Sequence, residues 1–398
     1  MPRFEPFRAH RFAVTDPQDI GPLVSPPYDV FDATERDRLA GLHPHNIVRV
    51  DYPVERDGES RYERSAEVLR GWVATGVVTT DDSPTFSLYR MEFTDDSGAA
   101  RSTVGVIGAL EVVDEGAGGV LPHERTTPKA KTDRLDLTRA TGANLSPVWG
   151  LSLTAGLSAL LEAHGETVAR TMDNDGVVHV LERISDPARI AAISAAVSSH
   201  PVLIADGHHR YAISRTYRDE QRAGGSVDGP AELTMTYVQE LVREQLSIAA
   251  IHRLFGHTSA GQVLERISDW YVTSPAGPVS QATLREMESR GCLCLVSPDG
   301  TGTYLTPRQE QFAAVRDLDS ARLEHALGDL IADVTYQHGV NDVLERLSSG
   351  QASCAVLIRP VSLVEIRRTA DTGELMPPKS TFFTPKLLTG MVWRPLDA

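Results

Sequence analysis

One short stretch of the chain combines residue types that handle phosphate and protons: Asp206-Gly207-His208-His209-Arg210. A glycine at a strand-to-helix junction lets the backbone approach a ligand closely. The first helical N–H groups then point at that ligand with the positive end of the helix dipole. Arg210 offers a forked cation for phosphate oxygens, and His208 and His209 are donors or proton carriers near neutral pH.

Asp206 ends the apolar run that precedes this loop, residues 201–205. A carboxylate there is suited to accept a proton from a hydroxyl or to hold a metal ion. The alternative is that Asp206 only caps the following helix and that the two histidines face solvent. Spacing alone leaves both interpretations open.

A second group of charges lies in residues 121–149, which are rich in charge and proline and weakly periodic. This segment is expected to be a long functional loop. Glu124 is a candidate ligand for Mg²⁺, and Arg125, Lys131 and Arg134 are candidate phosphate contacts, because phosphoryl transfer depends on positioning and charge neutralisation. Ordinary solvated charge is the alternative. His123-Glu124 does not open a zinc-binding helix, since no second histidine follows at the required spacing.

The third candidate segment, residues 376–390, is proline-rich and basic. Its polar side chains are Lys379, Ser380, Thr381 and Lys386. We expect this segment to close over phosphate, whereas the alternative is an edge strand with solvated lysines.

The chain resembles the domain-of-unknown-function 1015 family over nearly its whole length. Seven separated blocks carry the resemblance in order: Pro6-Phe7-Arg8, Pro26-Pro27-Tyr28-Asp29-Val30, His123-Glu124-Arg125-Thr126, Lys131-Thr132-Asp133-Arg134-Leu135, Asn144-Leu145-Ser146-Pro147, Ile204-Ala205-Asp206-Gly207-His208-His209-Arg210-Tyr211 (the histidine loop), and Met376-Pro377-Pro378-Lys379-Ser380-Thr381 with Pro385-Lys386. The histidine loop itself is similar to that of the ParB/sulfiredoxin-like superfamily, whose free serine kinases carry a similar Asp-Gly-His-His-Arg.

The resemblance implies a site in which two carboxylates surround the acceptor hydroxyl and the phosphate donor lies on the loop and the helix N-terminus. Asp206 matches the loop aspartate, and either Asp29 or Glu124 supplies the second carboxylate. A sulfiredoxin-type reductase is not expected, because His208 stands where that loop carries its cysteine. The family blocks also hold the residues expected to contact the acceptor, namely Tyr28, His123, Asn144 and Tyr211.

The elements that must position these residues indicate a mixed α/β fold. Hairpins are expected over residues 85–113 and 168–184, a buried strand over 201–205 followed by a helix, and helices near 258–268, 279–290 and 320–332. Cys292 and Cys294 are expected to be buried strand residues. We predict a ParB/sulfiredoxin-like catalytic lobe over residues 1–255 and a second α+β lobe over residues 256–398, whose tail at 376–390 returns to the site.

Composition limits the class of protein. With 39 Lys and Arg against 54 Asp and Glu, the formal net charge of −15 disfavours nucleic acid and anionic lipid as partners. The three cysteines are too few for a disulfide framework, and no signal segment or membrane-length apolar run is evident, so a cytoplasmic location is expected.

These observations favour a kinase that transfers a phosphoryl group to the hydroxyl of a small metabolite, with free L-serine as the first guess. The donor is expected to be ATP, ADP or pyrophosphate, with Mg²⁺. The rival class is a ParB-like, nucleotide-dependent nucleic-acid-binding or regulatory protein, which the negative charge disfavours. No membrane partner is expected, and a homodimer is left open.

Overall fold

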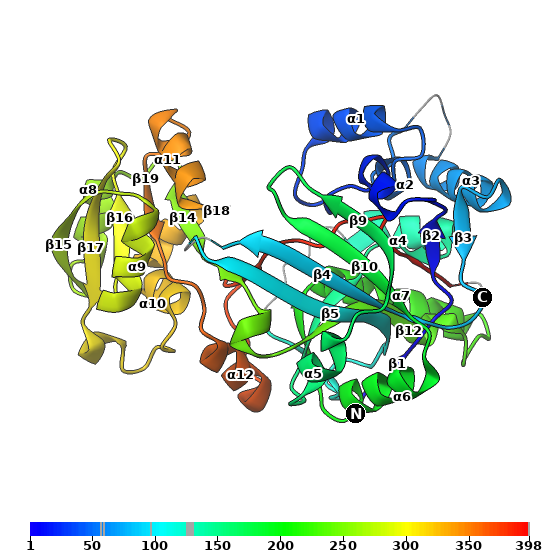
Figure 1. Cartoon of the computed structure of the whole chain (residues 1–398). Coiled ribbons are helices and arrows are strands. Elements are labelled where there is room, and N and C mark those ends of the chain that lie inside the picture. The colour runs from blue at the N-terminus through cyan, green and yellow to red at the C-terminus, as the bar shows by residue number, and fades with distance from the viewer. Residues whose placement is uncertain (56–57, 59, 96–97, 125–130, 397–398) are drawn as a thin grey trace.

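The computed structural model describes residues 1–55, 58, 60–95, 98–124 and 131–396 and, for residues 131 and 132, the main chain only. Two lobes, each built on one sheet, lie side by side (Figure 1). None of the described helices is long and apolar enough to cross a membrane.

The first lobe is built on a nine-stranded mixed sheet. Its strands are β1 (Phe4–Glu5), β4 (Phe86–Thr94), β5 (Ala100–Glu111), β6 (Val120–Pro122), β8 (Val148–Ser152), β9 (Glu166–Met172), β10 (Val178–Ile184), β11 (Val202–Asp206) and β12 (Leu233–Glu240). Their order is β6-β11-β8-β12-β5-β4-β10-β9, with β1 paired to β5. The pairs β6–β11 and β8–β12 are parallel and the others are antiparallel, so the predicted mixed α/β fold is confirmed.

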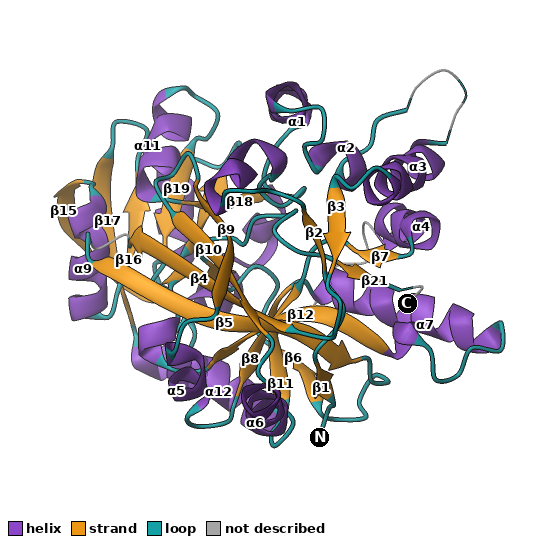
Figure 2. Cartoon of the chain, turned by 45° about the vertical axis from the view of Figure 1, so that its right-hand side comes forward, coloured by secondary structure: helices purple, strands orange, loops and turns teal. Residues whose placement is uncertain are grey.

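Both faces of this sheet are buried, because apolar residues of β4 alternate between two cores: Phe86 and Leu88 belong to one, and Tyr89 and Met91 to the other. Helices cover the two faces (Figure 2). On the first face they are α5 (Leu157–Glu162) and α6 (Pro187–Val197), and the opposite core includes residues of α3 (Arg61–Ala74) and α4 (Lys131–Thr141). The helix α7 (His208–Ala223) follows β11 directly.

The N-terminal part of the chain adds short elements to this lobe. They are β2 (His10–Phe12), η1 (Pro17–Leu23), α1 (Ala33–Leu42), α2 (Val48–Asp51), β3 (Val78–Thr80) and β7 (Ala143–Asn144), and later η2 (Pro230–Glu232), η3 (Arg243–Gln245) and β13 (Ile248–Ala249). The strand β7 pairs with β21 (Arg394–Pro395), so the end of the chain returns to the first lobe.

The second lobe is built on a six-stranded sheet of β14 (Ile251–Phe255), β15 (Tyr271–Pro278), β16 (Leu293–Val296), β17 (Thr301–Pro307), β18 (Val334–His338) and β19 (Cys354–Leu357), in the order β15-β17-β16-β19-β14-β18. Its helices are α8 (Ala260–Ile267), α9 (Gln281–Arg290), η4 (Gln309–Phe312), α10 (Asp319–Leu327), η5 (Gly328–Asp333), α11 (Val340–Ser348) and α12 (Leu363–Thr372). The sequence analysis places the lobe boundary after residue 255, and β14, which ends there, belongs to this second sheet.

After α12, residues 373–388 cross back to the first lobe, and we call this segment the strap. It contains β20 (Phe382–Phe383), which pairs with β13. The strap is far from the histidine loop in sequence, but hydrogen bonds connect it to Asp206 and to His123 and Glu124, which follow β6.

The sequence predicted the regular elements well and one segment wrongly. Both hairpins and the buried strand before Asp206 are confirmed; Cys294 is buried in β16, and Cys292 is buried directly before it. The long loop expected over residues 121–149 is wrong, since α4 and β7 fall within it and β6 and β8 overlap its ends. The helix α4 has a polar composition with weak periodicity, which is why the pattern did not reveal it.

Candidate active site

The candidate site lies where the parallel neighbours β6 and β11 end together. Val120 and Pro122 of β6 pair with Val202 and Ile204 of β11, so Glu124, just after β6, and Asp206, the last residue of β11, lie at the same edge. Ligands in α/β sheets commonly bind outside the carboxyl ends of strands. Gly207 continues with φ 82°, a left-handed conformation that favours glycine, and it is the N-cap of α7 without a side-chain capping bond.

Asp206 lies between two cations. Its Oδ2 is 3.0 Å from Lys386 Nζ and 3.3 Å from Arg210 Nη2, and its Oδ1 accepts the Gly207 N–H at 2.8 Å. Burial opposes ionisation of this carboxyl, but Lys386 and Arg210 outweigh that effect and hold its pKa well below the ordinary value. Asp206 is therefore an ionised anchor for two cations, and the residue that caps α7 is Gly207.

Glu124 is in the opposite electrostatic state. Its side chain is 18% exposed, and Oε2 accepts the Ser380 N–H at 3.3 Å. Burial raises the pKa of Glu124 to about 7; the Ser380 N–H and the Lys379 charge lower it, whereas the Asp206 charge raises it. A carboxyl that titrates near pH 7 can exchange a proton with a substrate hydroxyl.

Two neutral histidines lie beside these carboxylates. The Nδ1–H of His123 donates to the Ile204 carbonyl, and its Nε2 is 2.6 Å from Thr381 Oγ1. Its ring centroid is 4.8 Å from that of His208. Burial lowers the pKa of His123 to about 4 and, together with the nearby His123, the pKa of His208 to about 3. Both rings are thus uncharged at neutral pH and act as hydrogen-bonding groups.

Arg210 links the loop to a second group of charges from the N-terminal segment. Its Nη1 donates to the Pro147 carbonyl. Burial opposes its charge, but Asp206 and Asp29 outweigh burial and raise the pKa of the guanidinium. In the same group Arg134 lies 3.7 Å above the Tyr28 ring and donates to the backbone and carboxylate of Asp51.

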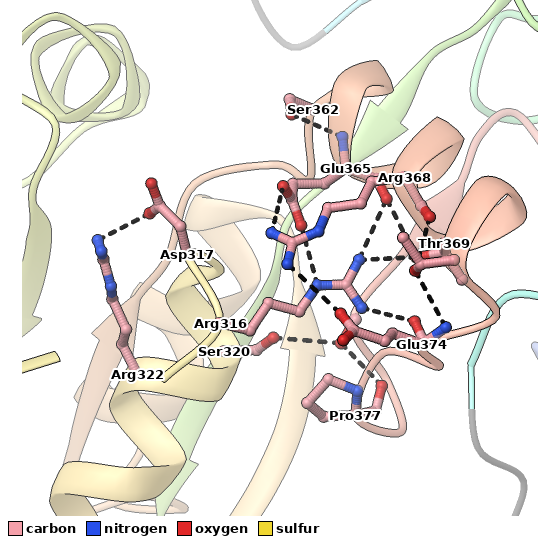
Figure 3. A network of polar contacts seen from close by, with 12 residues as sticks. Arg316, Asp317, Ser320, Arg322, Ser362, Glu365, Arg368, Thr369, Glu374 and Pro377 are labelled. Carbon is pink, nitrogen blue, oxygen red and sulfur yellow. Dashed lines mark hydrogen bonds and ion pairs between the residues drawn. The ribbon is translucent and has the colours of Figure 1, made fainter. Parts of the chain in front are cut away.

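The second lobe holds the N-terminal half of the strap in place (Figure 3). Arg316, on the loop before α10, donates to Glu365 Oε2 at 2.9 Å and to the Glu374 carbonyl at 2.7 Å. Ser320 Oγ lies 3.1 Å from Ser380 Oγ, which in turn donates to the Pro377 carbonyl. The strap therefore presents the Ser380 N–H to Glu124 from a fixed scaffold.

Arg253 completes this scaffold from β14. Its side chain is fully buried and Nη1 donates to the Lys379 carbonyl at 3.3 Å, while Nη2 pairs with Glu324 at 3.4 Å. Lys379 has φ 58°, the one positive φ recorded at a non-glycine residue in the described chain, and its side chain is exposed. The contact of Arg253 with the strap could not be predicted from local pattern, because Arg253 and Lys379 are 126 positions apart in the sequence.

The structure gathers many of the predicted residues and leaves others outside the cluster. Asp206, Gly207, His208, Arg210, His123, Glu124, Ser380, Thr381 and Lys386 lie together, and Lys379 adjoins them. His209 is in the first turn of α7 and is partly exposed, and Asp29 is exposed beside the Tyr28–Arg134 group. Arg125 and the side chain of Lys131 lie outside the described residues.

Two predicted acceptor contacts have other partners. The Tyr211 hydroxyl donates to the Glu111 carbonyl at 3.0 Å and accepts the Val113 N–H, at the end of β5. The Asn144 carboxamide oxygen accepts the Met235 N–H at 3.0 Å. These bonds connect Tyr211 of α7 to the end of β5 and Asn144 of β7 to β12.

A cavity of about 1020 Å³ opens between the two lobes beside the strap. Its wall includes Lys386 and Phe382 of the strap, Pro27 of the N-terminal segment, Asp173 of the β9–β10 turn and His338 of the second lobe. The volume is at the upper end of the range usual for small-molecule sites. Lys386 is therefore shared between this cavity and the carboxylate of Asp206.

A family model described as a protein of unknown function (DUF1015) matches residues 4–321. No curated protein matches the chain. Solved structures of similar fold include a conserved hypothetical protein from Pyrococcus furiosus, with 13% identity over 67% of this chain and 87% of that chain at a TM-score of 0.36. A free serine kinase in complex with AMP has 14% identity over 67% and 84% at 0.38. SbnI with C-terminal truncation from Staphylococcus aureus has 15% identity over 73% and 88% at 0.39. With TM-scores this low, the likenesses establish no shared activity.

Proposed function

The chain belongs to the DUF1015 family of proteins of unknown function, and we propose that it is a phosphotransferase, moving a phosphoryl group from a nucleotide or pyrophosphate to the hydroxyl of a small metabolite. The observation that carries this proposal is the pairing of Glu124 and Asp206 at one sheet edge. One carboxyl titrates near neutral pH, and the other stays ionised and holds two cations at a helix N-terminus.

The donor's phosphates would bind at the Asp206 end of the site. The helix α7 has 16 residues and begins directly after its N-cap Gly207, which offers no side-chain cap, so the first N–H groups of the helix are available to phosphate oxygens. Arg210 supplies a forked cation and Lys386 a point charge beside them. These groups would stabilise the charge that develops on the transferring phosphoryl group.

The acceptor's hydroxyl would lie against Glu124. As the hydroxyl oxygen bonds to phosphorus, the bond from phosphorus to the donor's leaving oxygen breaks and the hydroxyl proton passes to the Glu124 carboxylate. Asp206 is a weaker base than Glu124, because its pKa is held low by Lys386 and Arg210. Neutral His123, bonded to Thr381 Oγ1, would keep the strap aligned beside the reacting groups.

Magnesium fits this arrangement only in a limited way. Within the described part of the chain, no three His, Cys, Asp or Glu side chains gather as a ligand set. Mg²⁺ commonly enters phosphate sites with one or two protein carboxylates, the remaining ligands being phosphate oxygens and water. Asp206 and Glu124 are the carboxylates that would hold it, and the ion would neutralise phosphate charge.

L-serine is the first acceptor to test, on the strength of the loop resemblance. The interlobe cavity is large for a free amino acid, so longer hydroxylated metabolites belong in the same screen. The test combines ATP, ADP or pyrophosphate with Mg²⁺ and each acceptor, and phosphorus NMR detects the new phosphoester. Glu124→Gln serves as the inactive control, because it retains shape and loses the base.

Ligand binding tests the phosphate site apart from turnover. A donor present at a hundred times its dissociation constant should stabilise the folded chain by roughly 2.7 kcal/mol. The proposal fails if ATP, ADP and pyrophosphate, each with Mg²⁺, leave the melting temperature unchanged.

A further inference from the structure

The strap has a second anchor close to Lys386, and this anchor lies inside the core of the first lobe. The Leu388 N–H donates to the Tyr89 hydroxyl at 3.0 Å. Leu388 is 7% exposed and Tyr89 is 1% exposed. Two residues of extended chain span only about 7 Å, so a displacement of Leu388 also shifts the position of Lys386.

Tyr89 begins a chain of hydrogen bonds that runs through the core to the surface. Its hydroxyl is 3.0 Å from His179 Nδ1, and His179 Nε2 is 3.0 Å from Asp173 Oδ2. Because the Tyr89 oxygen accepts from Leu388, its own proton is free to go to Nδ1, which leaves Nε2–H to donate to Asp173. His179 is fully buried, and the Asp173 side chain is 20% exposed.

Asp173 is itself fixed by the turn between β9 and β10. Its Oδ1 accepts the N–H groups of Asp175 and Val177, both at 2.9 Å. Both oxygens of the Asp173 carboxylate thus accept hydrogen bonds, Oδ1 from the turn and Oδ2 from His179. A rigid hairpin end is in this way connected to the strap through two buried side chains.

The hydrogen-bonded relay of Asp173, His179, Tyr89 and Leu388 crosses the apolar core of the first lobe. Apolar side chains would fill this space without needing hydrogen-bond partners. Buried polar chains of this kind specify one geometry when every member is satisfied, and they are costly when one member is removed. The chain ends on the backbone of the strap beside a cation that lines the interlobe cavity. Both features point to control over the position of Lys386.

We propose that Asp173, His179 and Tyr89 are positioning residues that hold Leu388 and thereby keep Lys386 within bonding distance of Asp206 and of the donor's phosphate. This inference rests on the proposed function for its effect on phosphate binding. Its effect on Lys386 itself is independent of that function.

The test is Tyr89→Phe, read by the rate at which an amine-reactive reagent labels Lys386, followed by peptide mass spectrometry. The chain has four lysines, at 129, 131, 379 and 386, so the labelled peptides are few and distinct. Lys386 should be labelled several-fold faster once the strap is released, whereas exposed Lys379 serves as the internal reference. The dissociation constant for pyrophosphate with Mg²⁺ should rise roughly three- to tenfold, as for the loss of one hydrogen bond.

The matched control is Tyr271→Phe. Tyr271 is 2% exposed in the second lobe, and its hydroxyl has no hydrogen-bond partner among the described residues. This variant should change neither Lys386 labelling nor pyrophosphate affinity. Asp173→Asn tests the far end of the relay and should shift both readouts in the same direction as Tyr89→Phe.

An unchanged labelling rate of Lys386 in folded Tyr89→Phe would overturn the relay. If the parent protein binds no phosphate donor at all, the proposed function fails, and the labelling result still decides whether the relay positions Lys386. Faster labelling in Tyr89→Phe and in Tyr271→Phe alike would also count against it, since the effect would then reflect general loosening.

Discussion

Two parallel strands, β6 and β11, end side by side in the first lobe, and each has a carboxylate at its carboxyl end. Asp206, the last residue of β11, is 3.0 Å from Lys386 and 3.3 Å from Arg210. Glu124, after β6, has its pKa raised to about 7 by burial, and its hydrogen bond is to a backbone N–H of the strap. The same chemical group is thus held charged at one strand end and close to neutral at the other.

This difference indicates that the protonation state of each carboxylate depends on the groups that contact it, and not on its position in the sheet. A carboxylate with two cations contributes charge organisation, whereas one that titrates near the working pH can move a proton. From the sequence, Asp206 was a candidate to accept the hydroxyl proton, with Asp29 or Glu124 as the second carboxylate. We propose instead that Glu124 is the base and that Asp206 anchors Lys386 and Arg210.

The largest expected effect comes from removing the proposed base. Glu124→Gln should lower turnover roughly 10²–10⁴-fold, because the amide cannot accept the hydroxyl proton. In the parent, kcat/KM should rise with pH through about 7 as Glu124 loses its proton, and this rise should be absent from the residual activity of the variant. Asp29→Asn is the control, since Asp29 was the other candidate base and is exposed. Near-normal turnover of Glu124→Gln would show that another residue is the base.

The same substitution should stabilise the fold at alkaline pH. A carboxyl whose pKa is raised on folding from 4.5 to about 7 costs stability as pH rises through this window, because the folded chain must release a proton that it holds more tightly. The free energy of unfolding of Glu124→Gln should therefore exceed that of the parent by about 3 kcal/mol at pH 8 and match it near pH 4. Urea unfolding at both pH values measures this, and a constant difference would exclude titration of Glu124 as the cause.

Asp206→Asn, unlike Glu124→Gln, should lower the free energy of unfolding at neutral pH. Lys386 and Arg210 would lose their partner, and a loss of about 1–2 kcal/mol is expected for a pair that is partly exposed. Because the pKa of Asp206 is depressed, this contribution is present above its unfolded pKa of about 3.9 and is lost as pH falls below that value. Asp114→Asn removes an exposed carboxylate that pairs with the buried Arg218, and it should cost less stability than Asp206→Asn, because solvent screens the Asp114 charge. Equal losses in the two variants would contradict the assigned anchor role.

The local part of this site could be predicted from sequence. The apolar run before Asp206 predicts a buried strand, and Gly207 predicts the sharp turn into α7; both are confirmed. Prolines and lysines also indicated residues 376–390 as a candidate segment of the site. These features depend on short-range chemistry, which local sequence records.

The partners that set each pKa could not be predicted, because they come from distant parts of the chain. Ser380 and Glu124 form a hydrogen bond although they are 256 positions apart in the sequence, and Lys386 and Asp206 do so at a separation of 180 positions. The relay from Asp173 to Leu388 and the contact of Arg253 with Lys379 depend on how the lobes and hairpins pack. Local periodicity carries no information on such pairings.

One signal in the sequence would have strengthened the strap assignment. The chain has four lysines among its 39 Lys and Arg residues, and all four lie in residues 129–131 or 379–386. Arginine serves as the cation elsewhere. A lysine is a compact charge that differs from arginine in geometry and titration, so its restriction to these two segments marks them as chemically distinct.

The smallest expected effect concerns Arg210, the second cation of the Asp206 end. Its guanidinium uses Nη1 on the Pro147 carbonyl and Nη2 on Asp206, which a lysine cannot reproduce with a single ammonium. Arg210→Lys should weaken binding of pyrophosphate with Mg²⁺ roughly five- to tenfold while the chain stays folded, since charge is kept and only the fork is lost. Isothermal titration calorimetry measures the dissociation constant, and circular dichroism checks the fold. Arg215→Lys is the matched control, because Arg215 lies on the same helix and pairs with exposed Glu115. If both variants bind pyrophosphate like the parent, Arg210 holds the loop only through Pro147, and phosphate recognition at this strand end rests on Lys386 and the N-terminus of α7.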